Sequence, residues 1–143
     1  MTKMILFPTD GSATAKAAGR IAADIAKTEG DSVLVLVVSE RADFGGMEDE
    51  AVTESIARYM EGVAKDAAAE LERAGVSASP EVVIATKVDE AILEKAIEVD
   101  ADMIVMGTHG RGGLSRAVIG SVADRVLRHS PVPVVLVPLK DEG

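Results

Sequence analysis

The chain has 143 residues, no cysteine and a formal net charge of −9 at pH 7. Its length suits one domain with one buried core, and the missing cysteines exclude disulfides, thiolate metal sites and cysteine nucleophiles. The negative charge argues against a protein that binds nucleic acid, and no apolar run approaches the roughly 20 residues that span a bilayer. We therefore expect one soluble, cytoplasmic domain over residues 1–143 that binds neither nucleic acid nor membrane.

Apolar runs rich in β-branched residues alternate with helix-periodic runs along the whole chain. In chain order, the predicted elements are a strand at 3–8, a helix at 13–29, a strand at 32–38, a helix at 48–74, a strand at 80–85, a helix at 89–99, a strand at 102–107, a helix at 118–129 and a strand at 132–137. The strands lack a regular polar alternation, which is typical of a sheet with helices on both faces. This order predicts an α/β fold with a parallel sheet and right-handed crossovers.

Helical spacing also predicts which side chains face the core. The expected core residues include Ile21 of the first helix, Ile97 of the third and Leu127 of the fourth. Residues 40–49, which contain two adjacent glycines and many charges, are predicted to form a surface loop.

Ligands of open parallel sheets bind beyond the carboxyl ends of the strands, so the residues that follow each strand are the informative ones. The first strand is followed by PTDGS at 8–12, where either Asp10 or Ser12 can cap the next helix. Two interpretations of Asp10 stay open. It is a simple helix cap, or its carboxylate binds a sugar hydroxyl or a bound Mg²⁺.

The fourth strand is followed by a glycine-rich segment with the spacing Gly107, two residues, Gly110, nine residues, Gly120 and Ser121. Glycines let a phosphate chain lie against the backbone, and the N–H groups of a helix start donate to it. Residues 107–130 are also locally cationic, with four arginines and one aspartate. The segment is thus either a nucleotide cradle or a plain loop, and it matches neither a Walker A loop nor a GxGxxG fingerprint.

The two histidines do not indicate catalysis. We expect His109 to be a solvated loop residue, with a phosphate contact as the alternative, and His129 to close the last helix. Neither lies near a plausible serine and acid pair, so no hydrolytic triad is predicted. We expect no enzyme, although slow ATP hydrolysis stays open.

These segments, from ILFPTDGS at the start to MGTHGRGGLSRAVIGS near the end, resemble the universal stress protein family over essentially the whole chain. The spacing G-x2-G-x9-G-[ST] is typical of the family's ATP-binding branch. The resemblance implies a single-domain, open, five-stranded parallel sheet in the order 3-2-1-4-5 with helices on both faces, a Rossmann-like fold of the adenine nucleotide α-hydrolase type.

The resemblance further implies a site for ATP, AMP or ADP together with Mg²⁺, with the ion bound through the phosphates near Asp10. Asp10 would lie by the ribose or the metal, Val38 would pair its backbone with adenine, and Gly107 would lie under the ribose. The complete set of residues expected to bind the nucleotide is Pro8, Thr9, Asp10, Val38, Met106, Gly107, Gly110, Arg111, Gly120, Ser121 and Val122. Ala85 and Thr86 stand where many relatives have a glycine, which puts part of the adenine rim in question.

The family also implies a homodimer through the last strand, at residues 132–138, and an unidentified protein partner. The expected function is that of an ATP-binding stress-response module. Two alternatives remain, a slow ATPase on the same site and a nucleotide-free interaction module whose contact surface is the acidic 40–50 segment.

Overall fold

Five parallel strands form one sheet in the order β5-β2-β1-β6-β7, in a computed structural model that describes residues 3–109 and 119–139. The strands are β1 (Met4–Pro8), β2 (Ser32–Glu40), β5 (Ser77–Ala85), β6 (Met103–Gly107) and β7 (Val134–Val137). This order is the predicted one, because β5, β6 and β7 are the third, fourth and fifth strands of the sequence analysis. The reversal of strand order therefore falls between β1 and β6.

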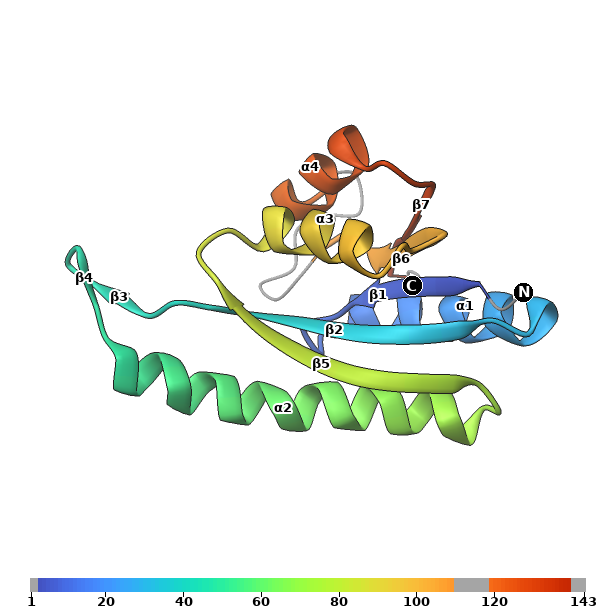
Figure 1. Ribbon diagram of the computed structural model, residues 1–143, viewed down its shortest axis with the longest axis horizontal. Helices are drawn as coiled ribbons and strands as arrows, with labels where there is room; N and C mark the ends of the chain where they lie inside the picture. Colours follow the sequence, from blue (N-terminus) through green and yellow to red (C-terminus); the bar gives the residue numbers. More distant parts are fainter. Residues whose placement is uncertain (1–2, 110–118, 140–143) are drawn as a thin grey trace.

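Four helices cover the two faces of the sheet (Figure 1). They are α1 (Ala13–Glu29), α2 (Glu50–Arg73), α3 (Val88–Glu98) and α4 (Ser121–His129). One core packs α1 and α2 against alternate strand residues such as Phe7 and Val35, and the other packs α3 and α4 against residues such as Leu6 and Ile104. The inner strands β1, β2 and β6 thus bury both of their faces, which explains why they lack polar alternation.

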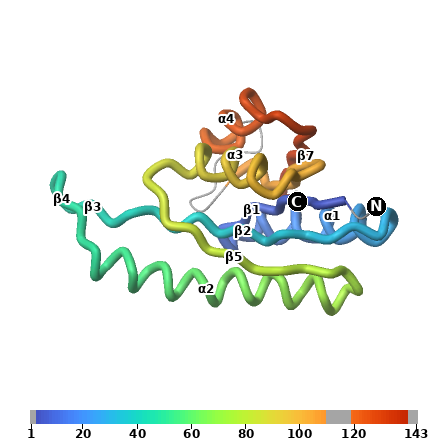
Figure 2. Tube along the Cα trace, in the orientation of Figure 1, coloured from blue at the N-terminus to red at the C-terminus, as the bar shows by residue number. Residues whose placement is uncertain are grey.

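The segment between β2 and α2 is more ordered than the predicted loop. It forms a small antiparallel hairpin of β3 (Asp43–Phe44) and β4 (Met47–Glu48). Figure 2 follows the chain past the end of the sheet into this hairpin, before it returns as α2. The predicted surface position is confirmed, and the hairpin adds a defined shape to it.

The prediction of a core position is wrong for three residues, because Ile21 is 37% exposed, Ile97 is 69% exposed and Leu127 is 46% exposed. The physical reason is clearest in α1, whose fully buried side chains are mostly alanines, whereas Ile25 is only partly buried. Small side chains let the helix lie close to the strands, and Gly19 packs directly on the ring of Phe7. Fit to the sheet, and not side-chain hydrophobicity alone, decides which helical face is buried.

Across residues 3–109 and 119–139, no helix combines the length and the apolar character that crossing a bilayer requires.

Candidate functional site

The main cavity lies at the carboxyl end of the sheet, where the strand order reverses. β1 pairs with β6 only near its start, through Ile5 with Met103 and Leu6 with Ile104. The other neighbour of β1 is β2, and the other neighbour of β6 is β7. These two neighbours lie on opposite sides of the β1–β6 pair. The resulting crevice has a volume of about 780 Å³, a size typical of small-molecule sites.

The structure brings most of the predicted site residues together around this cavity. Nine of the predicted residues line it, namely Pro8, Thr9, Asp10, Val38, Met106, Gly107, Gly120, Ser121 and Val122. The other two, Gly110 and Arg111, lie outside the described residues. Residues that follow β1 and β6 thus meet at one cavity, at the carboxyl ends of the parallel strands.

The turn from β1 to α1 holds Asp10 at the cavity wall. Ser12, and not Asp10, is the N-cap of α1, because its Oγ accepts the N–H of Ala15 at 3.2 Å. Asp10 precedes the cap, and its Oδ1 accepts the N–H of Ser12 at 2.9 Å. The interpretation of Asp10 as a simple cap is therefore wrong. Its carboxylate is part of the turn and also lines the cavity.

The start of α4 forms the opposite side of the same cavity. Gly120 is the N-cap and has no side chain to accept the first N–H groups of the helix. Its own N–H donates to the carbonyl oxygen of Thr108 at 2.7 Å, which ties the start of α4 to the end of β6. Because the next residues, Ser121 and Val122, line the cavity, this helix start offers N–H donors and a partial positive charge to an anion.

Two glycines of this site have close neighbours where a side chain would be. A Cβ at Gly120 would lie 3.0 Å from the carbonyl oxygen of Thr108, and a Cβ at Gly107 would lie 2.8 Å from Cγ2 of Thr14. Gly107 is thus required for the packing of the protein itself, whereas a Cβ at Gly120 would fit only if the carbonyl oxygen of Thr108 moved by a few tenths of an ångström. Their backbones still line the cavity, but the missing side chains do not simply make room for a ligand.

His109 is buried, with 9% of its surface exposed, so the expectation of a solvated loop histidine is wrong. Its Nδ1 lies 3.0 Å from Oγ1 of Thr108, within hydrogen-bond distance. The residue lines the cavity beside the start of α4. The hydrogen-bonded pair stiffens the segment that anchors Gly120.

The rest of the wall is apolar on one side and charged at the rim. Val38, Met106 and Ile92 supply apolar surface, as a planar base requires. Glu40 and Arg41 line the cavity at the end of β2, and the sequence analysis missed both. The signal was present, because they lie within three residues of the end of the second predicted strand at residue 38, but residues 40–49 were assigned to the surface loop.

Ala85 and Thr86, which stand where many relatives have a glycine, have little effect on the lining of this cavity. Ala85 lies beside Glu40 in the register of β5 and β2, and its carbonyl oxygen accepts the N–H of Arg41 at 3.2 Å. Neither Ala85 nor Thr86 lines the cavity.

Within the described part of the chain, no group of three or more acidic, histidine or cysteine residues could hold a metal ion. The residues at hand fit a magnesium ion only in the way such ions bind with nucleotides, through one or two carboxylates together with phosphate oxygens. Asp10 and Glu40 are the lining carboxylates.

Comparison with known proteins gives a consistent result. A family model described as the universal stress protein family matches residues 1–138. The universal stress protein MJ0531 of Methanocaldococcus jannaschii is 35% identical over 145 residues, which cover 97% of this chain and 85% of the relative. The solved structure of MJ0577, from the same organism, has a TM-score of 0.81 at 28% identity and covers 99% of both chains.

A solved universal stress protein of Archaeoglobus fulgidus, in complex with dAMP, has a TM-score of 0.68 at 24% identity. The alignment covers 96% of this chain and 98% of that one. At this identity the likeness concerns the fold.

Proposed function

The chain belongs to the universal stress protein family, and we propose that it is a stress-response module that binds an adenine nucleotide, ATP in particular, in the cavity between β1 and β6. The observation that carries this proposal is the start of α4. It presents N–H donors without a side-chain cap to the same cavity that Asp10 and an apolar wall line. A nucleotide needs these three surfaces, for phosphate, sugar and base.

In this arrangement each group of the nucleotide meets a matching part of the wall. The phosphates lie at Gly120 and Ser121, where N–H groups and a hydroxyl donate to them. The ribose lies near Asp10, and the base lies against Val38 and Met106. The dAMP complex of the Archaeoglobus protein, which shares this fold, supports an adenine nucleotide as the ligand.

The charge of the protein does not oppose this proposal. Charges at the surface are screened over about 8 Å at physiological salt, whereas each hydrogen bond to a charged group contributes about 1.5 to 3 kcal/mol. Micromolar affinity requires about 8 kcal/mol. A few donors at the start of α4, together with the apolar wall, therefore suffice, and a Mg²⁺ ion would offset part of the phosphate charge.

We propose that the nucleotide acts as a signal and is hydrolysed slowly or not at all. The lining carboxylates are Asp10 and Glu40, and Oδ1 of Asp10 already accepts the N–H of Ser12. A general base must be placed to take a proton from water, and His109, the lining histidine, already has its Nδ1 within hydrogen-bond distance of Oγ1 of Thr108. Sustained phosphate release by the purified protein would favour the alternative, a slow ATPase.

The proposal is tested with freshly purified protein. Small molecules released by denaturation are identified by mass spectrometry, and thermal unfolding is followed with ATP and Mg²⁺, with AMP, and with GTP and Mg²⁺. We expect an adenine nucleotide in the released fraction and an increase in melting temperature with adenine nucleotides that GTP does not match. No bound nucleotide together with no shift by any of the three ligands would contradict the proposal.

We further propose a homodimer through β7. This strand is at the edge of the sheet, and its four residues are each only partly buried. Unpaired edges invite pairing, and a second β7 would cover this one. Pro131, Pro133 and Pro138 flank the strand and restrict how it pairs. Analytical ultracentrifugation should give at least twice the chain mass, and a monomer at all concentrations would contradict the dimer.

A further inference from the structure

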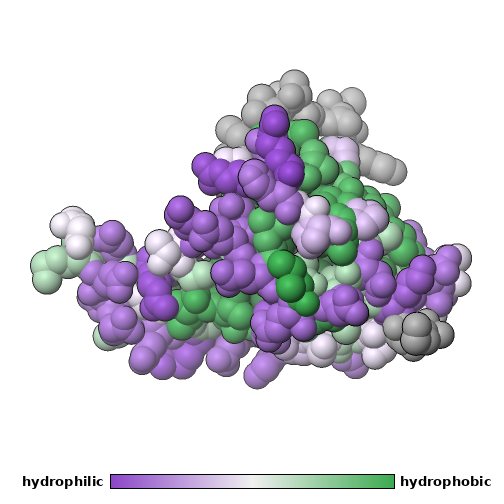
Figure 3. All heavy atoms as spheres, turned by 45° about the horizontal axis from the view of Figure 1, so that its top comes forward, coloured by the Kyte–Doolittle hydropathy of each residue, from purple (hydrophilic) through white to green (hydrophobic). Residues whose placement is uncertain are grey.

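The β3–β4 hairpin carries an exposed apolar pair at its tip. Phe44 and Met47 face each other in the hairpin register and are 63% and 75% exposed. Gly45 and Gly46, both with positive φ, form the two-residue turn between them, as such tight hairpins require. Figure 1 shows the hairpin beyond the end of the sheet, and in Figure 3 this projecting end carries apolar spheres bordered by hydrophilic ones.

Hydrogen bonds at its base hold this hairpin in place. The N–H of Asp49 donates to the carbonyl oxygen of Ala42 at 3.1 Å, which closes the base. Thr53 of α2 is 2% exposed, and its Oγ1 accepts the N–H of Ala42 at 2.9 Å and donates to the carbonyl oxygen of Asp49 at 2.8 Å. The tip is therefore presented by an organised base, which lowers the entropy that docking would cost.

The composition of the tip is that of an interface centre. Aromatic residues and methionine are enriched there, and Phe44 is one of only two phenylalanines in the chain. Asp43, Glu48 and Asp49 surround the pair. The surface that covers it must therefore have an apolar floor and cationic groups at its rim.

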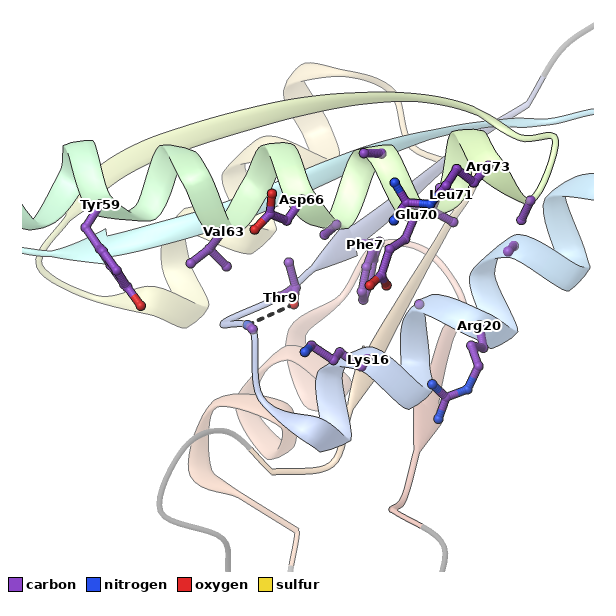
Figure 4. A pocket seen from close by; sticks show the side chains of 16 residues that line it. Phe7, Thr9, Lys16, Arg20, Tyr59, Val63, Asp66, Glu70, Leu71 and Arg73 are labelled. Atoms are coloured by element: carbon purple, nitrogen blue, oxygen red, sulfur yellow. Dashed lines mark hydrogen bonds between the residues drawn. The ribbon is translucent and has the colours of Figure 1, made fainter.

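Such a surface exists on the same protein, in a groove of about 410 Å³ between α1 and α2 (Figure 4). Its floor consists of apolar or small residues, among them Phe7, Gly19, Ala23, Val63 and Ala67.

Charged side chains stand along the walls of this groove. Lys16 and Arg20 come from α1, whereas Asp66 and Glu70 come from α2, and Arg73 lies at its far end. Among the described residues, no ion pair joins the α1 side of the groove to the α2 side. The cations of α1 are thus available to an acidic partner.

We infer that the hairpin tip of one copy docks into the α1–α2 groove of a second copy. Phe44 and Met47 lie on the apolar floor, and Asp43 and Glu48 lie near Lys16 and Arg20. The contact joins two different surfaces, so it is head-to-tail and can repeat from copy to copy. The groove shares Thr9 with the nucleotide cavity, but the apolar pair and the charged groups of this contact do not line that cavity, and the contact does not involve β7.

A tryptophan reporter tests this contact. The chain has no tryptophan, so Phe44→Trp places a single fluorophore at the tip without removing the aromatic group. We expect its emission to shift to shorter wavelength as the protein concentration rises. Adding Lys16→Glu and Arg20→Glu, both at exposed positions, should weaken this association at least about tenfold. Ile97→Ser, which removes an exposed apolar residue outside both surfaces, should not change it.

A mixing experiment separates the two halves of the contact. The first protein carries Phe44→Trp with Lys16→Glu and Arg20→Glu, so that its tip is intact and its groove is reversed in charge. The second carries Phe44→Ser and keeps an intact groove. Titrating the second protein into the first should restore the shift in emission, whereas a Phe44→Ser protein that also carries the two groove substitutions should not.

Three results would overturn the inference. The first is an emission that does not depend on protein concentration, which would assign the tip to a different protein. The second is a shift in the emission of the first protein alone, which would indicate tip-to-tip contact, and the third is an equal shift with both titrants.

Discussion

Gly107 packs directly against Thr14, because a Cβ at residue 107 would lie 2.8 Å from Cγ2 of Thr14 and 3.2 Å from its carbonyl oxygen. Thr14 is buried in the first turn of α1, and Gly107 ends β6. This contact brings the start of α1 close to the place between β1 and β6 where the strand order reverses. The glycine that the motif spacing singled out is thus needed for helix–strand packing in addition to any role in ligand binding.

Gly107→Ala should therefore destabilise the fold by about 1 to 3 kcal/mol, the usual cost of overpacking. Thr14→Ser removes the closest methyl group, so combining it with Gly107→Ala should recover part of the loss, although the backbone of residue 14 stays close. Urea unfolding of the four proteins of this double-mutant cycle measures the coupling. Strictly additive effects would show that the two residues do not meet as described.

Gly120→Ala should act on ligand binding more than on stability. The new Cβ would press on the carbonyl oxygen of Thr108, which accepts the N–H of residue 120, and so displace the start of α4. We expect at least about tenfold weaker ATP binding by calorimetry, the effect of losing one hydrogen bond to a charged group.

Gly62→Ala is the matched control. This glycine lies in the interior of α2 with open space around it. The substitution should stabilise the protein by about 0.5 to 1 kcal/mol and leave nucleotide affinity unchanged. If Gly120→Ala also left the affinity unchanged, the phosphates would not lie at α4.

The sequence pattern predicted the alternation of strands and helices, and the family resemblance implied the strand order, which the structure confirms. The bounds of α1 were correct because a serine cap and a glycine in the left-handed conformation, Ser12 and Gly30, mark its ends. β5 starts three residues earlier than predicted, at Ser77, because an edge strand exposes polar residues that carry no apolar signal.

Other features depend on tertiary packing and had no local signal. The buried face of α1 is set by how closely alanines let it approach the sheet. His109 is covered by its neighbours in the fold, although the glycines around it in the sequence suggest an open loop. Lys95, which is 8% exposed, was not predicted at all, because a buried lysine becomes acceptable only when acids from elsewhere in the fold reach it.

Two substitutions of Asp10 separate its role in the turn from its role toward a ligand. Asp10→Asn keeps an oxygen that accepts the N–H of Ser12 and loses the charge, whereas Asp10→Ala loses both. We expect Asp10→Asn to retain wild-type stability and Asp10→Ala to lose about 1 kcal/mol.

Both substitutions should lower ATP affinity in the presence of Mg²⁺, by about tenfold for the asparagine variant if one charged contact is lost. Repeating the titration with AMP and without Mg²⁺ distinguishes the two ligand roles of Asp10. A metal role weakens only the Mg²⁺-dependent binding, and a ribose role weakens both. Wild-type affinity in both variants would remove Asp10 from the site.

Lys95 makes the free energy of unfolding depend on pH in the alkaline range. Its pKa is raised above the ordinary value of 10.5, chiefly because Glu81 accepts a hydrogen bond from it, with Glu98 adding to the effect and burial opposing it. The pKa is therefore higher in the folded than in the unfolded protein, so the folded state holds this proton more tightly. The resulting stability is fully present below about pH 10.5 and is lost as the pH rises through the folded-state pKa.

Lys95→Met should lower the free energy of unfolding at neutral pH by roughly 1 to 2 kcal/mol, a modest effect because Glu81 and Glu98 keep contact with water. It should also flatten the fall in stability above about pH 10.5. The control is Lys65→Met, since Lys65 is exposed on α2 and makes no ion pair among the described residues. Urea unfolding across this pH range measures both variants, and equal alkaline slopes in wild type and Lys95→Met would show that the two glutamates do not hold the proton.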